Sequence, residues 1–311
     1  MTAGRIDTHV HYVPPAYRRY LAQEAFFGGQ ATPAWSPAAA LDEMGVLGVQ
    51  TSVLSVGRPG FWFGDVGRAA GMAREVNEYA ADLVRERPDR FGFFAALPLP
   101  DLDSALAEVA HAYDHLGCDG IVLLANNDGT YLGDPRLDPL MAELDRRGAV
   151  VFVHPNALPA TPVPDVPVFV ADFLLDTTRA ALNLVRHGVL RRFPRITFIL
   201  AHGGGFLPYA AHRVASLTPM ADTGAVDRAR FLDDCADFYY DTALTASAHS
   251  LPSLLAFARP GHVLYGSDWP YAREDNSEYF TAQLDACTDD EQVRASIHRG
   301  AAERLFPRLR R

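Results

Sequence analysis

Four of the eleven histidines and one aspartate stand where short apolar runs end, and together they could hold a metal ion. The residues are His9, His11, His154, His202 and Asp268. Imidazoles joined by one carboxylate make a site of intermediate hardness, which suits Zn²⁺ and also tolerates Mn²⁺ or Fe²⁺. A single histidine at the end of a strand is more often a hydrogen-bonded core residue, so a metal site requires the set to converge.

The spacing of these residues predicts that they do converge. His9 and His11 are two positions apart, so in a strand they point to the same side. The gaps from His11 to His154 and from His202 to Asp268 fit four and two βα units of about 30 to 40 residues. His154 and His202 are separated by one longer unit. The five residues would then stand at the mouths of the first, fifth, sixth and eighth strands of one barrel.

The elements that must position them are eight apolar runs with helical stretches between them. Residues 67–87 and 170–193 have the apolar spacing of helices. In a chain of 311 residues this alternation predicts an α/β fold, a (β/α)8 TIM barrel, with a doubly wound parallel sheet as the alternative. The predicted strands are short enough to be buried parallel strands, and they span residues 6–11, 51–56, 91–97, 120–124, 149–154, 196–202, 238–242 and 263–268.

The chain contains no internal repeat and no low-complexity linker, so we expect a single domain over residues 1–311. Its surplus length falls in loops over residues 21–40, 155–167 and 269–277. Each of these loops leaves the C-terminal end of a strand, the face where barrel enzymes keep their active sites. We expect the loops to form the walls of a pocket.

The composition excludes several classes of protein. The formal net charge is −10 and all 28 basic residues are arginine, so neither a lysine Schiff base nor a P-loop lysine can form. An acidic chain without a sustained basic stripe is not expected to bind nucleic acid. No long apolar run or leader-like segment indicates a membrane span or secretion, and three scattered cysteines are typical of a reduced cytoplasmic protein.

Four motifs in this sequence resemble the amidohydrolase superfamily: DTHVH at residues 7–11, VHP at 153–155, AHGGG at 201–205 and YGSDWP at 265–270. Residues 173–213 resemble the branch that contains aminocarboxymuconate-semialdehyde and 6-methylsalicylate decarboxylases. The resemblance implies that one metal is bound by His9, His11, His154 and Asp268, and that His202 is a catalytic acid or base beside it. The absence of lysine agrees, because the two-metal members bridge their ions with a carboxylated lysine. A mononuclear site with Zn²⁺ is therefore expected, and Mn²⁺ is the alternative ion.

Two arginines could bind a substrate carboxylate, for which the guanidinium offers a planar two-pronged donor. Arg213 inherits this role by resemblance, often in the neighbouring subunit's site, which implies a homodimer or a higher homo-oligomer. A surface ion pair is the competing interpretation of Arg213. Arg58, after the second strand, is the other candidate. Trp62 and Trp269 lie just past strand ends, where they could sandwich a planar acid or simply pack loops onto the barrel rim.

These observations favour a metal-dependent, non-oxidative decarboxylase of a small aromatic or unsaturated carboxylic acid of the salicylate or muconate-semialdehyde type. His202 or Asp268 would deliver the proton to the carbon that loses CO₂. The alternative is a hydrolase in which a metal-bound hydroxide attacks a lactone, ester or amide at the same site. A noncatalytic barrel is disfavoured because none of the five site residues is missing.

Overall fold

Eight parallel strands form the centre of the protein, and their order around the sheet follows their order in the chain. The computed structural model describes residues 4–24, 32–217 and 227–310. Each strand pairs with the next in parallel register. The strands are β1 (Arg5–His11), β2 (Val49–Ser55), β3 (Phe91–Ala96), β4 (Gly120–Leu124), β7 (Val150–His154), β8 (Thr197–Leu200), β9 (Tyr239–Asp241) and β10 (Val263–Leu264).

Backbone hydrogen bonds between β1 and the segment that follows β10 bring the two ends of the sheet together. The Thr8 N–H donates to the Tyr265 carbonyl at 3.0 Å, and the Asp268 N–H donates to the His9 carbonyl at 2.7 Å. Inside the barrel, Phe94 and Phe152 stack with their ring centroids 5.4 Å apart. The closed, sequentially ordered sheet confirms the predicted (β/α)8 barrel, and the alternative doubly wound sheet is wrong.

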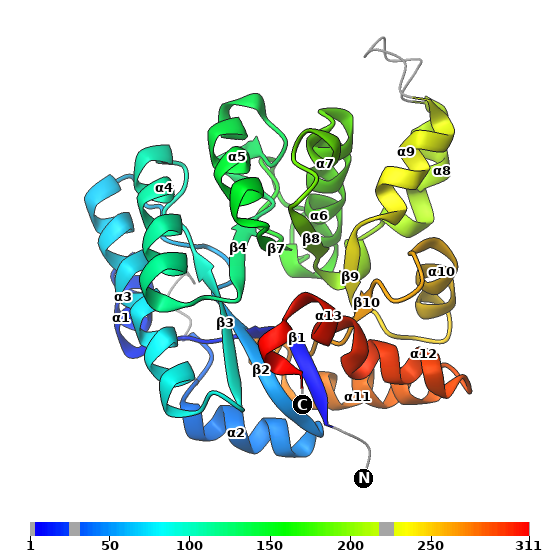
Figure 1. Cartoon of the computed structure of the whole chain (residues 1–311), viewed down its shortest axis with the longest axis horizontal. Coiled ribbons are helices and arrows are strands. Elements are labelled where there is room, and N and C mark those ends of the chain that lie inside the picture. The colour runs from blue at the N-terminus through cyan, green and yellow to red at the C-terminus, as the bar shows by residue number, and fades with distance from the viewer. Residues whose placement is uncertain (1–3, 25–31, 218–226, 311) are drawn as a thin grey trace.

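Helices surround the barrel, as Figure 1 shows, and several begin at a side-chain cap. Ser36, Asp65 and Asp101 each accept a backbone N–H from the first turn of α2, α3 and α4. The helices are α1 (Pro15–Gln23), α2 (Pro37–Val46), α3 (Val66–Glu86), α4 (Leu102–His111), α5 (Asp138–Arg147), α6 (Val168–Arg186), α7 (Val189–Arg192), α8 (Leu207–Leu217), α9 (Arg228–Ala236), α10 (Ser250–Phe257), α11 (Glu274–Ala286), α12 (Glu291–Ala295) and α13 (Ala301–Leu305).

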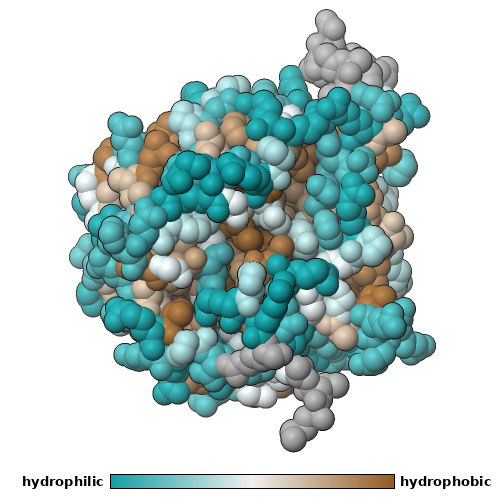
Figure 2. Space-filling model, viewed as in Figure 1, coloured by the Kyte–Doolittle hydropathy of each residue, from teal (hydrophilic) through white to brown (hydrophobic). Residues whose placement is uncertain are grey.

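Short elements complete the described chain. A two-stranded hairpin, β5 (Asn126–Asn127) and β6 (Thr130–Tyr131), follows β4. Single helical turns are η1 (Ala112–Leu116), η2 (Pro135–Leu137), η3 (His202–Gly204), η5 (Ser296–Gly300) and η6 (Pro307–Leu309). Polar residues cover most of the face seen in Figure 2, and apolar residues gather toward its middle, over the barrel. Among the described helices, none combines the length and the apolar character needed to cross a membrane.

The structure corrects several sequence-based boundaries. The predicted helix over residues 170–193 is two helices, because Gly188 takes a positive φ of 63° between α6 and α7. Its predicted apolar face is buried only toward the C-terminal half, and Val170 is 56% exposed. The sixth and eighth barrel strands end before His202 and Asp268, which lie in the turns that follow. Of the predicted loops, 155–167 is irregular, α2 and α11 begin inside the other two, and residues 25–31 of loop 21–40 lie outside the described residues.

The turn after β8 depends on a close approach between Gly205 and α6. Gly205 has a φ of +65°, and a Cβ atom there would lie 2.0 Å from the carbonyl oxygen of Leu174. We therefore expect Gly205→Ala to lower the free energy of unfolding by more than the roughly 1–2 kcal/mol cost of a left-handed non-glycine residue. Gly71→Ala on α3 is the matched control. A Cβ there meets nothing within 4 Å, so a gain of about 0.5–1 kcal/mol is expected. Chemical denaturation measures both, and equal midpoints would contradict the packing described here.

Candidate metal centre and active site

The structure brings three of the predicted histidines and the aspartate together at the C-terminal end of the barrel. His9 and His11 come from β1, His154 ends β7, and Asp268 follows β10. One donor atom from each of these four buried residues lies within 4.8 Å of every other. The Nε2 atoms of His9 and His11 are 3.2 Å apart. The same two Nε2 atoms lie 3.2 and 3.1 Å from Oδ1 of Asp268.

The second nitrogen of each of these three imidazoles has an acceptor of its own. Nδ1 of His9 lies 2.8 Å from Oδ2 of Asp241, and Nδ1 of His154 lies 2.8 Å from the carbonyl oxygen of Pro155. Nδ1 of His11 lies 3.3 Å from the carbonyl oxygen of Ser55. These acceptors assign the ring protons to Nδ1, so three Nε2 lone pairs and a carboxylate oxygen converge on one point. Such a set of acceptors needs a cation between them, and it fits a divalent metal.

Burial and charge act differently on the members of the cluster. Burial lowers the pKa of His9, but the Asp241 and Asp268 carboxylates outweigh it and raise that pKa to about 10. Burial and the neighbouring imidazoles hold the pKa of His154 well below its usual range. For Asp268, burial alone would raise the pKa, and the charge of His9 with hydrogen bonds from His11 and His202 brings it well below the usual value. The two carboxylates therefore favour positive charge at His9, which a bound divalent ion would also supply.

His202 lies beside the cluster and not among its four members. Its side chain is nearly buried, and its Nε2 is 3.4 Å from Oδ2 of Asp268. Its buried Nδ1 has no hydrogen-bond partner within the described part of the chain. The backbone of both residues is left-handed, with φ of +54° at His202 and +62° at Asp268. Non-glycine residues in this conformation store strain, and they cluster at active sites.

The two arginines predicted to bind substrate lie in different places. The Arg58 guanidinium, in the loop after β2, is 5.9 Å from the ring centroid of Phe173, whose ring is 6.3 Å from that of His154. Burial lowers the pKa of Arg58 and the charge of Asp176 raises it, but an arginine stays charged at neutral pH. Arg213 is exposed on α8 and forms no ion pair with any described residue. Arg58 therefore lies near the cluster, and Arg213 does not contact it.

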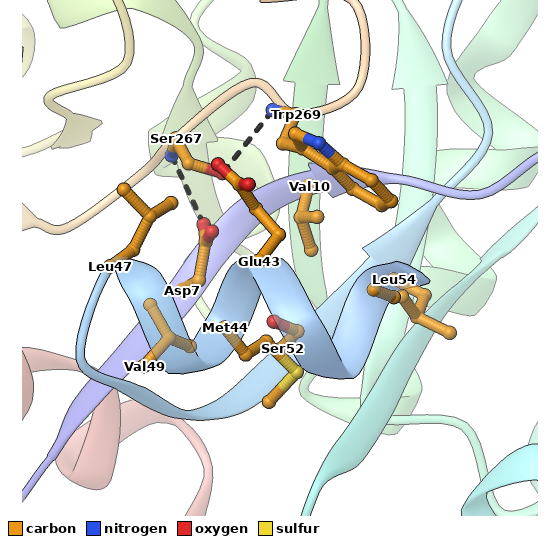
Figure 3. A pocket seen from close by; sticks show the side chains of 11 residues that line it. Asp7, Val10, Glu43, Met44, Leu47, Val49, Ser52, Leu54, Ser267 and Trp269 are labelled. Carbon is orange, nitrogen blue, oxygen red and sulfur yellow. Dashed lines mark hydrogen bonds between the residues drawn. The ribbon is translucent and has the colours of Figure 1, made fainter. Parts of the chain in front are cut away.

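Neither of the two tryptophans predicted to contact a substrate touches the metal cluster with its side chain in the described contacts. Trp62 is half-buried and packs against the core. The indole of Trp269 lies beside Val10 and Leu54, in a small cavity between the barrel and α2 (Figure 3). The indole thus faces α2 on the outside of the barrel. This packing does not favour contact between Trp269 and a substrate, and that contact stays a prediction. Tyr271 is one of the aromatic residues beside the cluster, and its ring lies edge-on to that of His11 with the centroids 5.2 Å apart.

Asp7 supports the cluster from the same cavity. Its Oδ1 accepts the backbone N–H groups of His9 at 3.0 Å and Ser267 at 3.2 Å, and Figure 3 shows the second of these bonds. Burial raises the pKa of Asp7 to about 7, although its hydrogen bonds with Ser267 and His9 act in the opposite direction. Asp7 thus ties β1 to the turn that carries Asp268.

Two residues of the site escaped the sequence analysis. Asp241 is the last residue of β9, a position similar to that of the predicted ligands at the ends of their strands. This position could have identified it from the sequence. Its carboxylate contacts the ring of His9 and the backbone of His202. Gly57 had no such signal. A Cβ atom there would lie 3.0 Å from Cε1 of His11 and 3.4 Å from Cε1 of His154, so glycine leaves the space in front of two imidazoles open.

The chain belongs to the amidohydrolase family, whose model matches residues 6–308. It is 38% identical to the 6-methylsalicylic acid decarboxylase of Penicillium expansum, over 99% of this chain and 97% of that protein. A crystal structure described as amidohydrolase II superimposes with a TM-score of 0.90 at 32% identity, covering 97% of this chain and 99% of the other. A 2,6-dihydroxybenzoate decarboxylase in complex with 2,6-dihydroxybenzoate gives a TM-score of 0.82 at 25% identity, covering 98% and 99%.

The geometry of the cluster predicts two kinds of variant. His9→Ala, His154→Ala or Asp268→Ala removes one of four converging donors, so each should lower metal occupancy sharply. His202→Ala should keep the metal and lose turnover on the order of 10²- to 10⁴-fold, as expected for a general acid or base. Elemental analysis and steady-state rates measure the two effects, with the exposed His115→Ala as the control. Metal loss in His202→Ala with full occupancy in His154→Ala would reverse the assignment.

Proposed function

We propose that the protein is a metal-dependent, non-oxidative decarboxylase of a small aromatic carboxylic acid of the hydroxybenzoate type. The observation that carries this proposal is the buried convergence of three imidazole nitrogens and Asp268 beside His202, whose Nδ1 has no hydrogen-bond partner among the described residues. The likeness to decarboxylases of 6-methylsalicylic and 2,6-dihydroxybenzoic acids supports the substrate class. An unsaturated acid of the muconate-semialdehyde type is the alternative substrate.

His9, His11, His154 and Asp268 would hold the metal, which when bound acts as a Lewis acid that withdraws electron density from the substrate. Zn²⁺ is the proposed ion because three imidazoles and one carboxylate suit it, and Mn²⁺ also accepts this donor set. The three cysteines form no disulfide, which supports a reducing, cytoplasmic location as part of the proposal.

The residues around the cluster account for the remaining steps. Arg58 would orient the acid by pairing with its carboxylate, which is supported by its guanidinium lying 5.9 Å from the ring of Phe173, itself 6.3 Å from the ring of His154. His202 or Asp268 would deliver a proton to the ring carbon that bears the carboxylate. The bond from that carbon to the carboxylate then breaks, its electron pair returns to the ring, and CO₂ leaves. Protonation before cleavage avoids an in-plane carbanion, so the placement of this acid decides the rate.

Incubation in deuterated water tests this reaction. With 6-methylsalicylate or 2,6-dihydroxybenzoate, we expect release of CO₂ and one deuterium on the carbon that carried the carboxylate. His202→Ala should lower the rate without changing the product. Hydrolysis would instead place labelled oxygen from ¹⁸O water in a new carboxylate of an ester or lactone. Absence of CO₂ from every hydroxybenzoate and muconate-type acid, in protein with full metal occupancy, would overturn the proposal.

We further propose that the active protein is a homodimer in which Arg213 reaches the partner's site. Exposed apolar side chains lie on and just before the helix that carries Arg213: Tyr209 on α8 is 89% exposed, and Phe206 in the preceding turn is 39% exposed. The Phe206 N–H donates to Thr178, so the start of α8 lies against α6, where Phe169 and Val170 are also exposed. Apolar surface around an arginine that does not reach its own site supports a contact with a second copy.

A mixing experiment tests the shared site. Arg213→Ala and His202→Ala chains should each be nearly inactive alone and should regain activity when their subunits exchange. A mixed dimer then has one site with both residues intact, and two-fold symmetry with random exchange makes about half of the dimers mixed. No recovery after exchange confirmed by mass spectrometry, or a fully active monomer in dilute solution, would mean that Arg213 does not act across an interface. Arg58 would then be the only proposed carboxylate-binding arginine.

A further inference from the structure

Asp241 is a buried carboxylate that joins the metal cluster to His202. Its exposed fraction is 0%, and it lies at the end of β9, between β8 and β10 in the sheet. Oδ2 lies 2.8 Å from Nδ1 of His9. Oδ1 accepts the backbone N–H of His202 at 2.9 Å and that of Ala243 at 3.0 Å. The Asp241 side chain therefore accepts three hydrogen bonds, from the ring of His9 and from the backbone of His202 and Ala243.

We propose that Asp241 is the positioning residue that sets both the metal-binding tautomer of His9 and the placement of His202. This inference rests on the proposed role of His9 as a metal ligand. While Oδ2 accepts from Nδ1 of His9, the proton of a neutral ring is held there and the Nε2 lone pair faces the cluster. While Oδ1 accepts from the His202 N–H, it holds in place a strained backbone with a φ of +54°.

The chemistry of an amide separates these two functions. In Asp241→Asn the side chain keeps one oxygen acceptor and gains an NH₂ donor. The backbone N–H groups of His202 and Ala243 can only donate, so the amide oxygen must stay with them. The NH₂ group then faces His9, which can satisfy it only by accepting at Nδ1 and carrying its proton on Nε2. That proton occupies the position where the metal would bind.

We therefore expect Asp241→Asn to weaken metal binding by about 10- to 100-fold, as for other partners of metal-binding histidines. Its turnover at saturating metal should fall less than that of Asp241→Ala, because His202 keeps its backbone contact. Asp241→Ala removes both functions, so it should weaken metal binding and also lose turnover that excess metal does not restore. Competition titrations with Zn²⁺ and a chromophoric chelator measure affinity, and rates at saturating Zn²⁺ measure the second effect.

The control is Asp119→Asn. Its carboxylate is 4% exposed, accepts the Phe93 N–H and pairs with Arg308 at the start of the barrel strands. It should lower thermal stability without changing Zn²⁺ affinity. Wild-type affinity in Asp241→Asn would overturn the tautomer function, and equal turnover of the Asn and Ala variants at saturating metal would overturn the placement of His202. If His9→Ala also binds Zn²⁺ normally, the ligand assignment fails; if only Asp241→Asn does, this inference alone fails.

Should Asp241→Ala not fold, the Asn variant still decides the first function. A crystal structure of Asp241→Asn decides the second, through the position of the His202 ring. A ring that stays in its wild-type place agrees with retention of the backbone contact, and a displaced ring contradicts it.

Discussion

The constraint on which this site depends is the convergence of several hydrogen-bond acceptors among buried side chains. Nε2 of His9 and of His11 lie 3.2 Å apart, and each is within 3.2 Å of Asp268. Lone pairs at such distances repel one another unless a cation or a proton lies between them. The Asp241 and Asp268 carboxylates raise the pKa of His9, so they favour a positive charge there. The fold must hold these groups together against their repulsion.

A closed parallel barrel provides that rigidity, because every strand delivers its C-terminal residue to the same rim. The ring of each histidine is then fixed by an acceptor from elsewhere: His11 by Ser55 on the neighbouring strand, His154 by the next residue and His9 by Asp241. The acceptors come from backbone carbonyls and one buried carboxylate, which cannot move without disturbing the sheet. The protein thus fixes ring orientation through the scaffold, and substrate contacts are left to the loops.

The part of this arrangement that follows strand periodicity could be predicted from the sequence. His9, His11 and His154 lie at or near strand ends and Asp268 lies in the turn after a strand, and the barrel brings these ends together at one rim. The orientation of Trp269 could not be predicted, because packing against α2 decides where a side chain points once the strand has ended. Asp241 was missed because its partners, His9 and the backbone of His202, are distant in sequence. Helix α6 ends earlier than its apolar pattern suggests because Gly188 adopts a left-handed conformation.

The left-handed backbone at His202 and Asp268 explains why the two proposed proton donors stand just past the regular strands. An L-residue pays roughly 1–2 kcal/mol in this conformation, so it persists only where the surroundings fix it. The Asp268 N–H donates to the His9 carbonyl at 2.7 Å, and the His202 N–H donates to Asp241 at 2.9 Å. The turn at Asp268 is therefore anchored to β1, and the turn at His202 is anchored to the Asp241 carboxylate that orients His9. Metal binding and proton delivery share Asp241 as a support, so a change that removes its whole carboxylate disturbs both.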